Sequence, residues 1–83
     1  MKYRKKGNVV TVTNFSNGIK LTETGKWLKV CNIPTVINPS SPIYANCLDG
    51  SNDKASIKIS DGELTAYTFA STTVGYFSVT YIV

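Results

Sequence analysis

Hydrophobic and polar residues alternate along most of the chain, and Gly, Asn, Asp and Pro interrupt the alternation at short intervals. The clearest stretch places Ala55, Ile57 and Ile59 on one side and Ser56 and Lys58 on the other. A period of two residues is the pattern of a β-strand with one buried face. This stretch therefore predicts a strand with an apolar inner face.

The same criteria predict strands along the rest of the chain. They cover residues 8–13, 19–22, 26–33, 43–48, 55–59, 63–69 and 75–83. Asn17-Gly18 and Asp61-Gly62 are dipeptides typical of tight turns. Residues 34–42 hold all three prolines and are predicted to form an extended loop between sheets. Seven to eight short strands predict an all-β fold, a compact antiparallel β-barrel or sandwich.

Two of these segments carry apolar groups on both sides. In 26–33, strict alternation places Trp27 and Cys31 on one side and Leu28 and Val30 on the other. The last segment, 75–83, has large apolar side chains on both faces. An exposed edge of that composition would invite aggregation, so we expect a central strand or one covered by a second subunit.

The length of 83 residues corresponds to one domain with a marginal core. Disulfides, a metal or oligomerisation usually stabilise domains of this size. The chain has no His and only two cysteines, Cys31 and Cys47, which we expect to be free, half-buried thiols. Oligomerisation remains the most available source of additional stability.

The net charge of +4 is concentrated at the start of the chain, in Lys2, Arg4, Lys5 and Lys6. We divide the chain into a basic lead-in, residues 1–7, and a single β domain, residues 8–83. The lead-in is interpreted as a solvated segment, although the Gly7-Asn8 turn signal would also allow it to pair as a hairpin. Binding patches normally interleave cations through the fold, so we expect no nucleic-acid partner. No apolar run approaches the length of a membrane span.

Enzyme chemistry has little support in the sequence. The commonest general base, His, is absent, and a Cys nucleophile would lack its usual partner. Four of the five carboxylates lie in or beside predicted turns. Residues 49–53 are the nearest approach to a calcium loop but lack the terminal acidic ligand. We therefore expect no catalytic residues, no metal and no cofactor.

Aromatic residues are numerous for so short a chain. Flat rings hold the apolar face of a sugar, while amides and carboxylates accept or donate to its hydroxyls. Core or subunit packing is the alternative, and it is favoured for Trp27, Phe69, Phe77 and Tyr81. The candidate ligand-binding residues are Tyr44, Asn46, Tyr67, Trp27 and Asp49.

Several short motifs suggest a family. They are GKWLKV at 25–30, IP at 33–34, PIYA at 42–45, IKISDGEL at 57–64 and GYFSVTY at 75–81. Together they resemble the C-terminal head domain of receptor-binding proteins, from the tail fibre or baseplate of tailed phages that infect Gram-positive bacteria. The resemblance covers most of residues 8–83.

The resemblance implies a trimeric β head at the tip of a fibre, which binds host cell-wall polysaccharide during adsorption. Such a protein is made in the host cytoplasm, belongs to the virion, and meets other tail or baseplate proteins through an upstream segment. The alternative is a structural trimerisation or capping module without its own ligand. The sugar-contacting residues of the family vary and include His in some members, so none is carried over to this chain.

Overall fold

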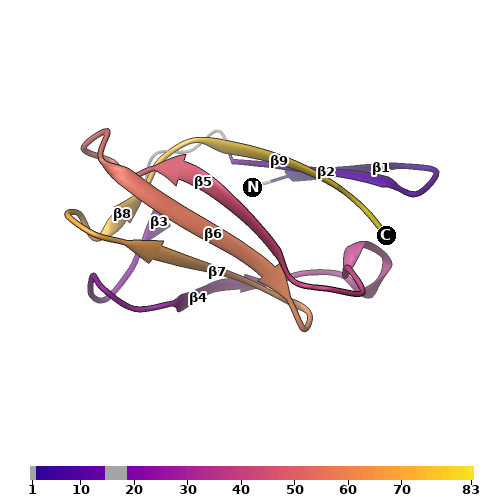
Figure 1. Ribbon diagram of the computed structural model, residues 1–83, viewed down its shortest axis with the longest axis horizontal. Helices are drawn as coiled ribbons and strands as arrows, with labels where there is room; N and C mark the ends of the chain where they lie inside the picture. The colour runs from indigo at the N-terminus through magenta and orange to yellow at the C-terminus, as the bar shows by residue number, and fades with distance from the viewer. Residues whose placement is uncertain (1, 15–18) are drawn as a thin grey trace.

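The computed structural model describes residues 2–14 and 19–83, and it shows an all-β chain (Figure 1). The predicted Asn17-Gly18 turn lies outside the described residues. The described part holds nine strands and one short 3-10 helix. They are β1 (Lys2–Lys6), β2 (Val9–Asn14), β3 (Ile19–Lys20), β4 (Leu28–Asn32), η1 (Thr35–Ile37), β5 (Ile43–Leu48), β6 (Lys54–Ser60), β7 (Glu63–Thr68), β8 (Thr73–Val74) and β9 (Phe77–Ile82).

The strands form two main antiparallel sheets that pack face to face. One has the order β4-β7-β6-β5 and the other β1-β2-β9, while β3 and β8 make a small two-stranded sheet. In Figure 1 the four-stranded sheet runs diagonally across the molecule, and β9, β2 and β1 lie above it. The predicted antiparallel all-β architecture is therefore confirmed, in the form of a sandwich.

The core lies between these sheets and takes every second residue of β2, β6, β7 and β9. In β6 the buried residues are Ala55, Ile57 and Ile59, as the alternation predicts. The Asp61-Gly62 turn is also confirmed, because both residues have the positive φ angles that a tight hairpin needs. The rest of the apolar core comprises Val10, Val12, Leu21, Ile33, Ile37, Leu64, Ala66, Val74, Phe77, Val79 and Tyr81.

The proline-rich segment is not the fully extended loop that the sequence predicts. Three of its residues form η1, and Ile37 at its end is only 1% exposed. The hydroxyl of Tyr81 donates a hydrogen bond of 2.7 Å to the carbonyl of Ile37. The segment therefore covers one end of the core, because burying Ile37 stabilises the turn. The prediction that it runs between sheets is wrong, since it joins β4 to β5 of the same four-stranded sheet.

Strand β4 departs from strict alternation because it contains a bulge. Its register with β7 shifts between Lys29 and Cys31, so that Leu28 lies opposite Ala66 and Cys31 opposite Leu64. Ala66 and Leu64 both face the core. The prediction that Cys31 shares a side with Trp27 is therefore wrong, since the extra residue in a bulge reverses the alternation.

Both cysteines are free, as predicted, and each is partly buried. Burial raises the pKa of the Cys31 thiol, against a smaller opposing effect of nearby positive charge. Burial also raises the pKa of the Cys47 thiol, and the Asp49 charge adds to the shift. At neutral pH both groups are therefore neutral thiols, which are poor nucleophiles.

Strand β9 lies at the edge of its sheet within the described residues, so of the two predicted alternatives the central strand is wrong. Cover by a second subunit stays a prediction. The segment just before β9 is hydrogen-bonded to the other sheet, because the amide of Gly75 donates to the carbonyl of Leu48 at 2.9 Å. A Cβ at Gly75 would lie 2.8 Å from that carbonyl oxygen, so only glycine permits this approach. Farther along, the outer side chain of Ile82 is 72% exposed.

Candidate functional site

Four aromatic side chains gather on the outer face of the four-stranded sheet. We name this group the aromatic row; it consists of Tyr44, Trp27, Tyr67 and Phe69. Successive ring centroids are separated by 6.0 Å between Tyr44 and Trp27, 5.6 Å between Trp27 and Tyr67, and 4.8 Å between Tyr67 and Phe69. Neighbouring rings are inclined at 56–69°. Edge-to-face contacts of this kind are each worth about 0.5–1.5 kcal/mol, which helps to hold the rings in place.

The position of the row follows from the alternation and register of the strands. Tyr44 in β5 lies opposite Lys58 in β6, and both point away from the core because their neighbours in sequence point inward. One step along the sheet, Asn46 lies opposite Ser56, and Ser56 lies opposite Tyr67. The outward positions of three adjacent strands therefore bring residues distant in sequence onto one surface.

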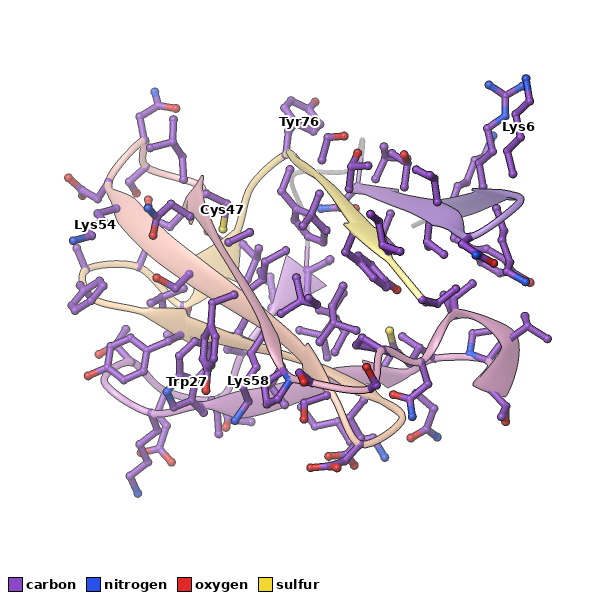
Figure 2. The ribbon with its side chains drawn as sticks, turned by 45° about the vertical axis from the view of Figure 1, so that its right-hand side comes forward. Lys6, Trp27, Cys47, Lys54, Lys58 and Tyr76 are labelled. Carbon is purple, nitrogen blue, oxygen red and sulfur yellow. The ribbon has the colours of Figure 1, made fainter. Side chains whose placement is uncertain are left out.

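Two lysines lie against the rings. The Nζ atom of Lys58 is 5.2 Å from the centroid of Trp27, and the Nζ atom of Lys54 is 6.0 Å from that of Phe69. Figure 2 shows Lys58 beside Trp27 on this face, with Lys54 farther along β6. A cation over an exposed ring contributes about 0.5–1 kcal/mol. The row thus presents apolar ring surface with ammonium groups beside it.

Two other lysines, one in β4 and one just before it, differ from Lys54 and Lys58 because each has a carboxylate beside it. The Nζ atom of Lys29 lies 3.4 Å from Oε2 of Glu63, and the Nζ atom of Lys26 lies 3.5 Å from Oε1 of Glu23. Both pairs are solvent-exposed, so they add little stability. Lys54 and Lys58 form no such pair within residues 2–14 and 19–83, and their charges remain available to a ligand.

The rings are accessible as well as clustered. Tyr44 is 64% exposed, Phe69 56% and Trp27 39%, and Tyr67 is half-buried. Of the two predicted alternatives, core packing is therefore wrong for Trp27 and Phe69, because the second sheet covers the other face, and packing against a second subunit stays a prediction. For Phe77 and Tyr81 the same prediction is confirmed, since both are buried between the sheets.

The surface around the row is open rather than hollow. The structure has a cavity of about 290 Å³ between the β1–β2 hairpin and the segment after β4, and another of about 150 Å³ beside Leu48, Asp49 and Tyr76. Neither contains a residue of the aromatic row. Small molecules usually bind in enclosed pockets, whereas an open ring surface suits one side of an extended polymer.

The sequence-predicted site residues are only partly brought together. Trp27, Tyr44 and Tyr67 are members of the aromatic row, and Asn46 lies on the same face in register with Tyr67. Phe69 and Lys58 were missed as site residues. The alternation of 55–59 already placed Lys58 outward, and Phe69 follows Tyr67 at the same period of two, so both signals were present in the sequence.

Asp49 stands apart from the row and is only 2% exposed. Its Oδ1 atom accepts hydrogen bonds from the backbone amides of Ser51 at 2.7 Å and Asp53 at 3.0 Å. Its amide in turn donates to the carbonyl of Asp53 at 2.8 Å. Oδ1 therefore fixes the β5–β6 loop, while Oδ2 is buried without a hydrogen-bond partner among the described residues. A role of Asp49 in ligand binding stays a prediction.

We expect Asp49→Ala to destabilise the domain by roughly 1–3 kcal/mol, because two loop amides lose their acceptor. Asp49→Asn keeps an oxygen at this position and should cost less. Urea unfolding followed by tryptophan fluorescence measures both values. Equal losses for the two variants would contradict the loop-fixing role, and Asp53→Ala, an exposed side chain in the same loop, is the matched control.

Comparison of the chain with family models, with curated proteins and with solved structures returned no match. The part of the chain that the structure describes holds no cluster of three His, Cys, Asp or Glu side chains suited to a metal ion. It also forms no helix with the length and apolar character needed to cross a bilayer. The features of the chain that bear on function are therefore the aromatic row and the motifs of the sequence.

Proposed function

We propose that the chain is a receptor-binding head domain of a phage tail fibre or baseplate, which recognises a saccharide of the host cell wall. The observation that carries the proposal is the aromatic row: four contiguous rings on an open sheet face, three of them substantially exposed. Exposed apolar surface that is gathered in one patch usually marks a site of interaction.

The composition of the face matches the chemistry of a sugar. The rings offer flat apolar surface for the C–H groups of a pyranose, and their conformational entropy cost on binding is low. Asn46, Ser56 and the hydroxyls of Tyr44 and Tyr67 provide donors and acceptors beside the rings. An open surface of this kind binds weakly, with Kd on the order of mM to μM, and many copies on one virion would supply avidity.

The test is direct binding of the domain to purified cell-wall polysaccharide from a susceptible host strain, monitored by ¹H-¹⁵N NMR titration. We expect shift changes at the amides flanking Tyr44 and Tyr67, and a loss of affinity of at least about tenfold in Tyr44→Ala. Tyr44→Phe retains the ring and should retain most of the affinity. Absence of binding to wall saccharide from every susceptible strain would refute the proposal.

A second candidate is a structural trimerisation or capping module, and a specific observation favours it. Leu48 is 49% exposed and Tyr76 is 60% exposed, and the two residues border the same cavity. Tyr76 precedes β9 in the other sheet, whereas Leu48 lies opposite Lys54 on the outer face that carries the row. This apolar surface therefore borders the row at Leu48, and it would suit contact with a second copy. Sedimentation velocity distinguishes the candidates: a Tyr76→Asp variant that becomes monomeric but still binds polysaccharide supports both activities, with separate surfaces.

A further inference from the structure

The basic lead-in forms a strand of the β1-β2-β9 sheet, so its positive charges have fixed positions on the surface of the domain. Residues 2–6 form β1, which pairs along its whole length with β2. Tyr3 and Lys5 lie opposite Val12 and Val10, which face the core. The intervening residues Lys2, Arg4 and Lys6 must then point to the outer side. Figure 2 shows Lys6 pointing away from the body of the domain.

Hydroxyl groups continue this surface across the neighbouring strands. Arg4 lies opposite Thr11, and Thr11 lies opposite Thr80, with their two hydroxyl oxygens 3.1 Å apart. Lys2 lies opposite Thr13, which in turn lies opposite Ser78. The outer face of β1, β2 and β9 therefore carries a row of cations on β1, with hydroxyls beside Lys2 and Arg4 and the exposed apolar Val9 and Ile82 beside Lys6. We name it the basic face.

The spacing of this face is regular and carries one sign of charge. Side chains on the same face of a strand are spaced about 6.8 Å apart, and adjacent strands lie about 4.8 Å apart. None of the five acidic residues of the chain lies in β1, β2 or β9. Cations spaced in this way, with hydroxyl donors beside them, are complementary to a chain of repeated phosphate groups.

We propose that the basic face docks a phosphate-bearing polysaccharide of the host cell wall, as a second surface separate from the aromatic row. The inference rests on the proposed function for the source of the polymer. Single-stranded nucleic acid is the other common phosphate polymer, but proteins that bind it stack its bases on aromatic rings. The strand positions of this face carry no aromatic side chain beside the cations. A phosphate chain without bases fits the observed surface better.

The decisive experiment compares adjacent lysines on opposite sides of β1. Lys6→Gln and Lys5→Gln remove the same charge, but only the first removes it from the basic face. Arg4→Gln with Lys6→Gln should lower affinity for a synthetic oligo(glycerol phosphate) about tenfold, and Lys5→Gln should change it less than about twofold. The slope of log affinity against log salt should fall by about 1.5–2 in the double variant. Thermal melting by circular dichroism confirms that each variant is folded.

Two further arms separate this inference from the proposed function. Dephosphorylated wall polysaccharide should bind Arg4→Gln/Lys6→Gln as well as it binds the parent chain, and it should bind Tyr44→Ala poorly. Oligo(glycerol phosphate) should show the reverse dependence. Equal losses in Lys5→Gln and Lys6→Gln would overturn the inference, as would tighter binding of single-stranded DNA of equal charge. Failure of dephosphorylated polysaccharide to bind, with phosphate binding intact, would refute the saccharide role of the row instead.

Discussion

Replacing Ile57 by Ala is expected to unfold most of the isolated domain at 37 °C. Ile57 is 1% exposed and lies in β6, between two other strands of its sheet. Its partners in register are Ala45 on β5 and Ala66 on β7, so Ile57 is the only large side chain in that row of three. Two small neighbours cannot fill the space that the missing methylene and methyl groups would leave.

The size of the effect follows from this geometry. Truncating a buried Ile to Ala costs roughly 2–5 kcal/mol, and the larger values belong to sites that cannot collapse. A domain of this length has about 3–5 kcal/mol to lose unless it oligomerises. Urea unfolding measures the loss, with Ser56→Ala, adjacent but on the outer face, as the control within about 0.5 kcal/mol of the parent. A loss below about 1 kcal/mol for Ile57→Ala would mean that this part of the core is not packed as described.

The region around β6 is also where the sequence predicted the structure best. Strict alternation over 55–59, a turn dipeptide at 61–62 and renewed alternation from 63 onward all agree with one hairpin. Because one face of this hairpin is buried, a shift of one residue would expose every core side chain. Local and long-range requirements coincide here, and the prediction was therefore reliable.

Strand β4 shows why the same reasoning fails elsewhere. Residues 27–31 carry apolar side chains in both phases of the alternation, so the sequence does not determine which residue is the extra one of a bulge. The register with β7 decides it, and that register depends on the position of Leu64 and Ala66 in the core. Contacts between distant strands thus set the orientation of Cys31.

The candidate site was predictable in part for a related reason. The small inward residues Ala66 and Thr68 identified Tyr67 as outward-facing, and the alternation of 43–48 placed Tyr44 and Asn46 together. The sequence does not determine which face of the sheet the second sheet covers, so it favours core or subunit packing for Phe69 and for Trp27, although Trp27 is also a candidate ligand-binding residue. The Asp49-Gly50 turn was evident, but the two amides that occupy the Asp49 side chain were not.

Trp27→Ala is expected to lower saccharide affinity about thirtyfold or more while leaving the fold intact. Trp27 is the central contact of the row, because its ring meets both Tyr44 and Tyr67 and also carries the ammonium of Lys58. Its removal takes away one binding surface and releases two other rings from their fixed orientation. Aromatic residues at the centre of an interface typically cost at least 2 kcal/mol when truncated, which corresponds to about thirtyfold in affinity.

The contributions of ring and cation can be separated with further variants. Trp27→Phe keeps a smaller ring and should retain part of the affinity, whereas Lys58→Met removes only the charge and should cost less than about tenfold for a neutral saccharide. Tyr3→Ala is the control, because Tyr3 is 48% exposed but belongs to β1 in the other sheet. Because Trp27 is outside the core, its loss should lower stability by only about 1–2 kcal/mol, mainly through the two ring contacts. Unchanged affinity in a folded Trp27→Ala variant would remove the aromatic row from the binding site, and the exposed rings would then need another explanation.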